Sequence, residues 1–179
     1  MADTISIRSA MPSVREALEA LQRRASLANT GDREAILAHP DAIEIPLCQL
    51  ESGHVYVAER GNAIIGFAAI LARDDGDTEL DALFVEPTMW RQGIGHQLVE
   101  RCEAAAREFG SKARCVSGNP HAREFYDSSG FRKVGVQATR FGEGILYRKV
   151  LDWLSQLRTF SLDRFGCIRD ESKRLNMDC

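Results

Sequence analysis

The sequence lacks any apolar run that approaches the roughly 20 residues needed to cross a lipid bilayer. Its first residues, Met-Ala-Asp-Thr, do not form the basic region followed by an apolar one that marks a secretory signal. We therefore expect a cytoplasmic protein that does not associate with membranes.

Metal-binding and nucleic-acid-binding patterns are also missing. The five cysteines are scattered without a Cys-x-x-Cys pair, and His39, His96 and His121 show no metal-ligand spacing with one another or with the cysteines. The formal net charge is −3, and the arginines are spread along the chain rather than clustered. We expect neither a bound metal nor a nucleic-acid partner.

Residues 80–99 carry the strongest signal that is present, an apolar strand-like run that passes through Pro87 and a Gly-Ile-Gly turn into a helix. The first turn of such a helix has unpaired backbone N–H groups, which favour binding of a phosphate. Gly93 and Gly95 lack side chains, so the phosphate can come close to the backbone. A dinucleotide fingerprint would need a glycine at Leu98, and the Gly-Lys-Ser/Thr of a P-loop is absent. A turn that binds nothing is the alternative.

A second segment, residues 116–131, reads as a strand end, a short helix and a Gly-Phe that begins another strand. Together the two segments resemble the GCN5-related N-acetyltransferase (GNAT) superfamily. Its cofactor loop reads Arg/Gln-x-x-Gly-x-Gly/Ala, and its next helix reads Asn-x-x-Ala-x-x-Phe-Tyr. The resemblance covers residues 4–150 in the order of elements and is sharpest over 80–131. One position departs from the family, because Trp90 begins the loop motif; we expect Trp90 to be a packing residue.

Hydrophobic periodicity and turn residues predict the element order β-α-α-β-β-β-α-β-α-β-β. The order predicts an α/β sandwich with a mixed sheet. It is also the order that the resemblance implies, which would give a GNAT-type fold with a mixed, mostly antiparallel sheet of about seven strands flanked by helices. The predicted strands are 4–9, 55–59, 63–71, 78–85, 113–117, 131–137 and 143–150, and the predicted helices begin near Met11 and span 30–39, 91–109 and 120–129. Residues 40–53 are expected to be loop.

The resemblance assigns residues 1–150 to an N-acetyltransferase domain and leaves 151–179 as a C-terminal helical extension with a frayed tail. Trp153, Leu157 and Phe160 keep helical spacing, and the chain becomes polar after Gly166. This segment is either an arm that forms a homodimer, a lid over the active site, or a helix that caps the domain's own core, which we favour.

By this resemblance the protein is an acyltransferase that uses acetyl-CoA and transfers its acetyl group by direct attack of a primary amine of a small molecule or peptide. Tyr126 would protonate the departing thiolate, although it also suits an aromatic anchor for its short helix. The strand end would bind the pantetheine arm, the loop would cup the pyrophosphate, and an asparagine that can cap its helix would contact the cofactor arm. The implied cofactor-binding residues are Phe84, Val85, Arg91, Gln92, Gly93, Ile94, Gly95, His96 and Asn119.

The general base stays open in the sequence. Glu79 and Asp81 are the catalytic candidates on the strand that leads to the cofactor, and Glu44, His54 or a chain of water molecules are the alternatives. Strand alternation predicts that the two carboxylates share one face, with the apolar residues Leu80, Ala82 and Phe84 on the other.

The resemblance implies that the acceptor contacts residues 26–54, the end of the first helix, the second helix and the loop after it. This region holds five acidic residues, Asp32, Glu34, Asp41, Glu44 and Glu51, and Arg33 as their counter-charge. An acidic mouth would suit a cationic amine, but we prefer the reading of an ordinary charged loop. Two other functions remain, a catalytically silent acetyl-CoA sensor or scaffold and a toxin-like acyltransferase acting on aminoacyl-tRNA. The acidic balance disfavours the latter. Longer acyl donors are a variant of the main prediction.

Overall fold

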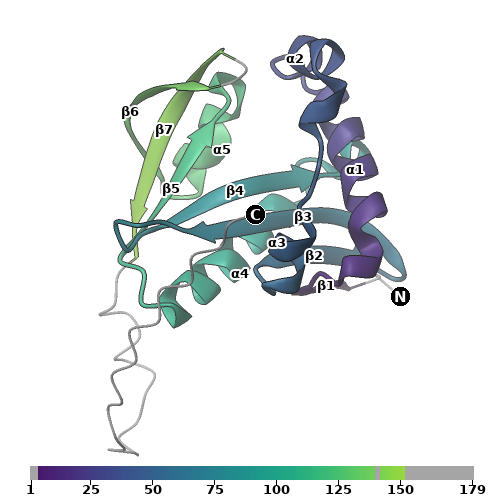
Figure 1. Cartoon of the computed structure of the whole chain (residues 1–179), viewed down its shortest axis with the longest axis horizontal. Helices are drawn as coiled ribbons and strands as arrows, with labels where there is room; N and C mark the ends of the chain where they lie inside the picture. The colour runs from purple at the N-terminus through teal and green to yellow at the C-terminus, as the bar shows by residue number, and fades with distance from the viewer. Residues whose placement is uncertain (1–3, 140–141, 152–179) are drawn as a thin grey trace, which may run out of the picture.

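The computed structural model describes residues 4–139 and 142–151. Its helices and strands follow the predicted order, and the predicted fold class is confirmed (Figure 1). The strands are β1 (Ile5–Ser9), β2 (Val55–Arg60), β3 (Ala63–Ala72), β4 (Thr78–Val85), β5 (Ala113–Gly118), β6 (Arg132–Thr139) and β7 (Gly142–Val150). The α-helices are α1 (Arg15–Ala28), α2 (Arg33–Ala38), α3 (Leu47–Glu51), α4 (Ile94–Glu108) and α5 (Arg123–Ser128). Across these ranges, no helix combines the length and apolar character needed to cross a membrane.

Seven strands form one sheet in the order β1-β2-β3-β4-β5-β7-β6. Neighbouring strands are antiparallel except β4 and β5, which pair in parallel only at Thr78 with Arg114 and at Glu79 with Cys115. Beyond Glu79 the two strands diverge, so β5, β6 and β7 form a leaf that turns away from β1 to β4 (Figure 1). This divergence positions the candidate site.

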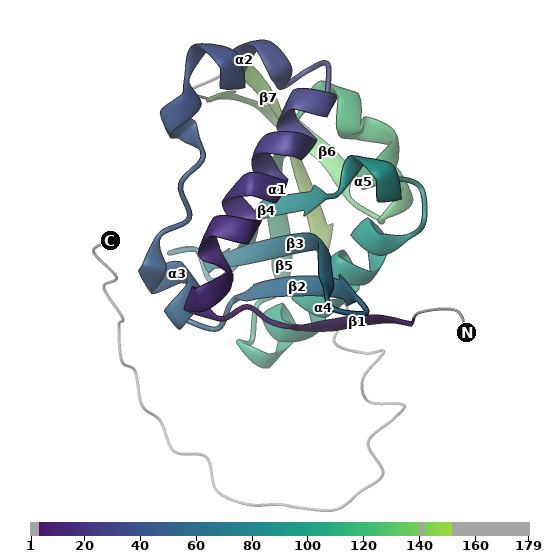
Figure 2. The same cartoon turned by 90° about the vertical axis from the view of Figure 1, so that its right-hand side faces the viewer.

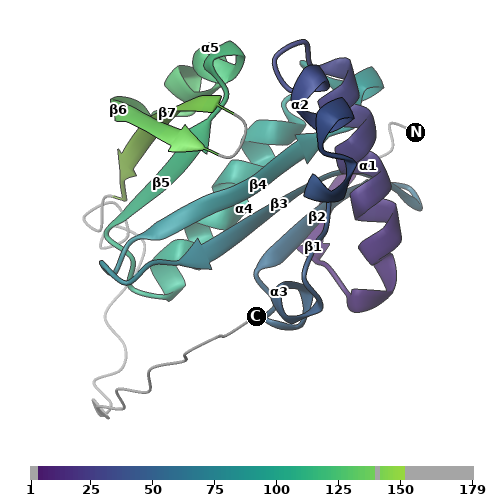
Figure 3. The same ribbon diagram turned by 45° about the horizontal axis from the view of Figure 1, so that its top comes forward.

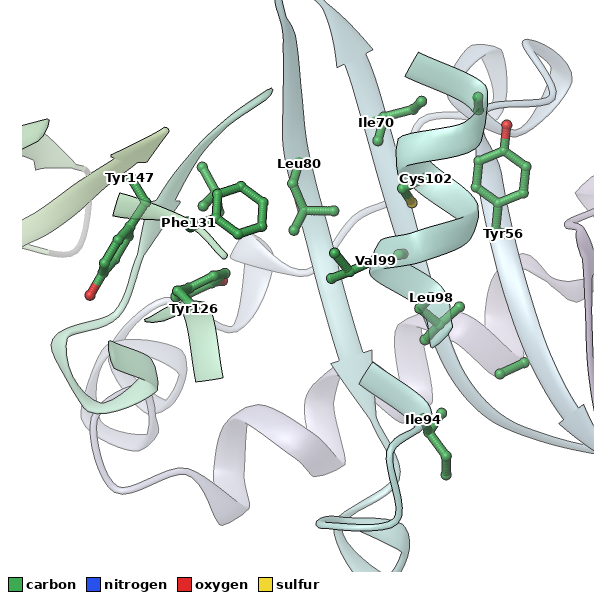
Figure 4. Close-up of a cluster of buried hydrophobic side chains, with 14 of the residues drawn as sticks. Tyr56, Ile70, Leu80, Ile94, Leu98, Val99, Cys102, Tyr126, Phe131 and Tyr147 are labelled. Carbon is green, nitrogen blue, oxygen red and sulfur yellow. The ribbon is translucent and has the colours of Figure 1, made fainter. Parts of the chain in front are cut away.

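Two hydrophobic clusters lie on opposite faces of the sheet. Alternate residues of β2 and β3 belong to different clusters, and alternate residues of a strand point to opposite faces. Helix α4 covers one face and α1 crosses the other (Figures 2 and 3). In the α4 cluster, Leu98, Val99 and Cys102 are at most 2% exposed and point toward the sheet, as their helical spacing predicts (Figure 4). Burying an aliphatic side chain of this size contributes roughly 1.5–3 kcal/mol.

A β-bulge at Asp81 changes which face each residue of β4 takes. Ala69 pairs with Ala82 and Ile70 pairs with Leu80, so Asp81 has no partner in β3. The extra residue reverses the alternation of side chains. Leu80 therefore packs in the α4 cluster, whereas Ala82 packs against the α1 cluster. The predicted shared face for Leu80, Ala82 and Phe84 is wrong for Leu80.

Three predicted boundaries also need correction. Part of the expected loop over 40–53 is helical, since residues 40–42 form a 3₁₀ turn and Leu47–Glu51 form α3, which Leu50 anchors with 2% exposure. The helix expected over 91–109 begins only at Ile94. The helix expected over 120–129 is a 3₁₀ turn followed by α5. Residues 152–179 lie outside the described residues, so the helical extension stays a prediction.

Candidate active site

A cavity of about 1500 Å³ opens where β4 and β5 diverge. Residues of α1, the α1–α2 loop, β4, the β4–α4 loop, β5, α5 and β7 line it. Among the described strands, none pairs with the edges that face this cavity, on β4 beyond Glu79 and on β5 beyond Cys115. Such an edge binds an extended, amide-bearing chain in the way that it would bind another strand.

The loop between β4 and α4 has the backbone of an anion cradle. Arg91 has a positive φ of 64° and Gly93 a φ of 79°, both in the left-handed region. A non-glycine residue there is strained, and strain of this kind concentrates at functional sites. Left-handed residues within a loop turn successive N–H groups toward one point and form an anion-binding nest. Gly93 is also the N-cap of α4, so the N–H groups of the first turn face the same end of the cavity.

Gly95 sits where α4 meets α5. A Cβ atom at this position would lie 3.0 Å from Cε2 of Phe125. His96 reinforces the contact, with Nε2 3.1 Å from Oγ of Ser128 and its ring centroid 4.9 Å from that of Phe125. The glycine thus serves the packing of α5 as well as the approach of a ligand to the backbone.

The predicted cofactor residues of this loop differ in where their side chains lie. Arg91, Gln92 and His96 are exposed, whereas Ile94 is 1% exposed and packs in the α4 cluster, so it can offer only its backbone to a ligand. Gln92 accepts a hydrogen bond of 3.0 Å from Nη2 of Arg60 on β2.

Trp90 is not the packing residue that the sequence predicted. Its side chain is 43% exposed, belongs to neither hydrophobic cluster and lies on the cavity lining. The indole Nε1 donates a hydrogen bond of 2.8 Å to the carbonyl oxygen of Val85. Of the two strand-end residues predicted to bind the cofactor, Val85 therefore already has a partner for its carbonyl. The ring of Phe84 packs on that of Phe67, with centroids 5.5 Å apart.

Tyr126 reaches the cavity from α5 and is 8% exposed. Its ring lies over Gly118, where an added Cβ would come within 2.5 Å of Cε2, and beside Tyr147, with ring centroids 4.9 Å apart (Figure 4). Burial raises the pKa of the Tyr126 phenol far above its usual value, with smaller contributions from Tyr147 and Asp32. Burial thus holds the hydroxyl in its protonated form, in which it can donate a hydrogen bond to a developing negative charge.

Asn119 caps the 3₁₀ turn that precedes α5, as predicted, because its Oδ1 accepts a hydrogen bond of 2.9 Å from the backbone N–H of His121. Its Nδ2 donates to Oδ1 of Asp32 in the α1–α2 loop. The sequence placed Asp32 only in a charged loop, and nothing in the pattern of residues indicated this pairing.

The four side chains proposed as general base separate into two groups. Glu79 and Asp81 both line the cavity; Glu79 forms an ion pair of 3.4 Å with Arg73, and Asp81 accepts a hydrogen bond of 2.9 Å from Gln49. Glu44 and His54 do not line it. The structure thus favours the two strand residues by position.

Most of the acidic residues that line the cavity lie outside residues 26–54. Of the five acidic residues in that range, only Asp32 lines the cavity. Two others, Glu124 on α5 and Glu143 on β7, were not predicted from the sequence. Within the part of the chain that the structure describes, no three His, Cys, Asp or Glu residues are grouped so that they could hold a metal ion.

Comparison with known proteins gives the same picture. The model of the acetyltransferase (GNAT) family matches residues 16–131. An amino-acid acetyltransferase from Azotobacter vinelandii is 36% identical over 98 residues, which is 54% of this chain and 22% of that protein. An uncharacterised N-acetyltransferase from Mycobacterium tuberculosis is 29% identical over 92 residues, which is 49% of this chain and 58% of that protein. The chain therefore spans less than two thirds of the length of either relative.

Among solved structures, the PaiA N-acetyltransferase of Thermoplasma acidophilum in complex with coenzyme A has a TM-score of 0.66. Its sequence is 20% identical, and the match covers 82% of this chain and 99% of that one. This likeness shows that the two chains share a fold.

Proposed function

This chain belongs to the GNAT family of acetyltransferases, and on that premise we propose that it transfers an acetyl group from acetyl-CoA to a primary amine of a small molecule or peptide. One observation carries the proposal. A single cavity holds an anion cradle, formed by residues 91–96, and the buried, protonated phenol of Tyr126, and the unpaired strand edges lie between them. The first feature suits the pyrophosphate of the cofactor, and the second suits the sulfur at its other end.

The residues present fit acetyl-CoA along its length. Backbone N–H groups of the cradle would bind the pyrophosphate, with a modest attraction from the dipole of α4. The free backbone edge of β4 would bind the amides of the pantetheine arm, whereas alternation along the strand turns the N–H and C=O of Phe84 toward β3. The Val85 carbonyl retains one lone pair beside its bond from Trp90. Asn119 would contact the arm from the facing strand.

When bound, acetyl-CoA supplies an activated acetyl thioester. Glu79 or Asp81 would accept a proton from the acceptor's ammonium group, directly or through water, because an amine with a pKa near 10.4 must lose a proton before it can attack. Tyr126 would donate its proton to the sulfur as the carbon–sulfur bond breaks and the carbon–nitrogen bond forms. The second proton lost by the amine nitrogen restores the phenol.

Charge in the cavity supports a cationic acceptor. Five carboxylates line it, those of Asp32, Glu79, Asp81, Glu124 and Glu143. The one arginine that lines it within the described ranges, Arg91, belongs to the cradle. The resulting field attracts an ammonium group into the cavity.

The test is a thermal titration with acetyl-CoA, followed by thiol release with a panel of amines. A ligand at about 100 times its dissociation constant stabilises a protein by about 2.7 kcal/mol, which raises the melting temperature of a domain this size by several degrees. We expect that shift, and thiol release with at least one cationic amine. Binding without thiol release from any acceptor would indicate a sensor or scaffold instead, and no shift at millimolar acetyl-CoA would contradict the proposal.

A further inference from the structure

The side chain of Trp90 is exposed and yet held in one position, and no packing contact in a hydrophobic cluster accounts for it. An indole buries about 150–250 Å² when it packs, so leaving 43% of the side chain exposed forgoes much of that stabilisation. The ring is nevertheless held, because Nε1 donates its hydrogen bond to the Val85 carbonyl at 2.8 Å. A rigid aromatic face at the rim of a cavity is a surface prepared for a ligand.

The loop around Trp90 is also braced from β2. The guanidinium of Arg60 donates to Sδ of Met89 at 3.5 Å and to Oε1 of Gln92 at 3.0 Å, so it holds the residues on both sides of Trp90. Trp90 lies directly before the left-handed Arg91, at the start of the cradle. A ligand whose phosphates occupy the cradle must therefore place its neighbouring groups close to the indole.

We propose that Trp90 is the platform on which the adenine ring of the cofactor stacks. The inference rests on the proposed use of acetyl-CoA. The pyrophosphate joins two halves of that molecule, and the pantetheine half enters the cavity between β4 and β5. The adenosine half lies on the other side of the phosphates, and within the described ranges Trp90 is the one exposed large hydrophobic residue of the cavity lining that it can meet. Every base presents a flat π-face, and the exposed indole matches it.

The test compares acetyl-CoA with S-acetyl-4′-phosphopantetheine, which lacks the adenosine half. Stacking of one base on an aromatic side chain corresponds to about a 5- to 150-fold change in affinity. Trp90→Ala should weaken acetyl-CoA binding by that factor, measured by calorimetry, and should change binding of the truncated ligand little. Trp90→Phe, which keeps an aromatic face but loses the bond to Val85, should retain most of the affinity for acetyl-CoA.

Phe109 offers a matched control, because it is also an exposed aromatic residue, 49% accessible, but does not line the cavity. Phe109→Ala should leave both affinities unchanged. An equal loss for both ligands in Trp90→Ala would show that Trp90 acts by shaping the loop, and would overturn the inference. If the wild-type protein binds the truncated ligand and acetyl-CoA equally well, the inference also fails while the proposed function stands. If it binds neither, both fail.

Fluorescence gives an independent readout. The sequence holds two tryptophans, so Trp153→Phe leaves Trp90 as the only one. Adenosine 3′,5′-bisphosphate should quench this single indole, and S-acetyl-4′-phosphopantetheine should not. Quenching by the truncated ligand alone would contradict the stacking.

Discussion

Asn119 and Asp32 stand 87 residues apart in the chain and are joined by a hydrogen bond of 2.5 Å between Nδ2 and Oδ1. Gly31 allows this approach, because a Cβ there would come within 2.4 Å of His121 and 2.5 Å of Asn119. The bond connects the α1–α2 loop with the end of β5, on opposite sides of the divergence between β4 and β5. The proposed acceptor side and cofactor side of the cavity thus share one wall.

Replacing Asp32 should therefore weaken binding of the acceptor more than binding of the cofactor. We expect Asp32→Ala to raise the KM for a cationic amine about tenfold, within the range for a lost hydrogen bond to a charged group. The affinity for acetyl-CoA should change less. Glu34→Ala, at an exposed residue of α2 that does not line the cavity, is the control. If the acetyl-CoA dissociation constant rises as much as KM, Asp32 serves the cofactor instead.

Tyr126→Phe should reduce turnover by about 10²- to 10⁴-fold and leave acetyl-CoA binding nearly intact, because it removes a proton donor but keeps the ring. Tyr147→Phe is the matched control. Its hydroxyl is buried without a hydrogen-bond partner among the described residues, so its removal should leave activity unchanged and stability equal or higher. Initial rates and melting temperatures measure both. Full activity of Tyr126→Phe would remove this tyrosine from the mechanism.

Gly95→Val should lower acetyl-CoA affinity at least tenfold, because its side chain would press on Phe125 and crowd the first turn of α4. Gly135→Val in β6 is the comparison, since no atom of the described residues lies within 4 Å of where its Cβ would be. Isothermal titration of both variants gives the answer. Unchanged affinity in Gly95→Val would mean that the cradle is not the phosphate site.

Glu103 supports a buried group of charges behind the active site. Its carboxylate is 2.6 Å from Nζ of Lys149 and 3.9 Å from Nη1 of Arg114, which is fully buried and also donates to the Val99 carbonyl. Glu103→Gln should lower the free energy of unfolding by about 3–5 kcal/mol, because three cations, Lys149, Arg114 and Arg107, lose their counter-charge. Glu108→Gln, at an exposed residue of the same helix, should cost less than about 0.5 kcal/mol. If urea denaturation gave the same loss of stability for both variants, Glu103 would not be the counter-charge of this buried group.

His54 should make stability depend on pH. Burial lowers the pKa of His54, whose ring packs edge-on against Phe109 with centroids 4.5 Å apart. The unfolded chain, with a histidine pKa near 6.5, then binds a proton more readily than the folded one. This contribution to stability is present above about pH 6.5 and is lost as the pH falls below it. His54→Gln should reduce the difference in urea midpoint between pH 5 and pH 8, whereas His121→Gln, at an exposed residue, should not.

Local chemistry explains which features of the site the sequence predicted. The left-handed turn needs Gly93, the 3₁₀ turn after β5 needs the cap of Asn119, and the buried face of α4 follows from the spacing of Leu98 and Cys102. Each depends on residues within a few positions of one another. The family and the fold class follow from these motifs and their order.

Long-range pairing decided the rest. The register between β3 and β4 places a bulge at Asp81 and sends Leu80 to the face of α4, which strand alternation alone predicts wrongly. Trp90 is a local exception, because its indole donates to the carbonyl of Val85, five residues earlier at the end of β4, rather than entering a core. Nothing near Arg114 in the sequence indicates that Glu103 will neutralise it in the interior.

By itself, the sequence determined the order of elements and the cradle, because backbone conformation and helix capping respond to neighbouring residues. Only the tertiary structure decided that Asp32 meets Asn119 and that Glu79 and Asp81, rather than Glu44 and His54, line the cavity. These contacts arise where β4 and β5 part and where separate loops converge, so they depend on packing between segments far apart in the chain.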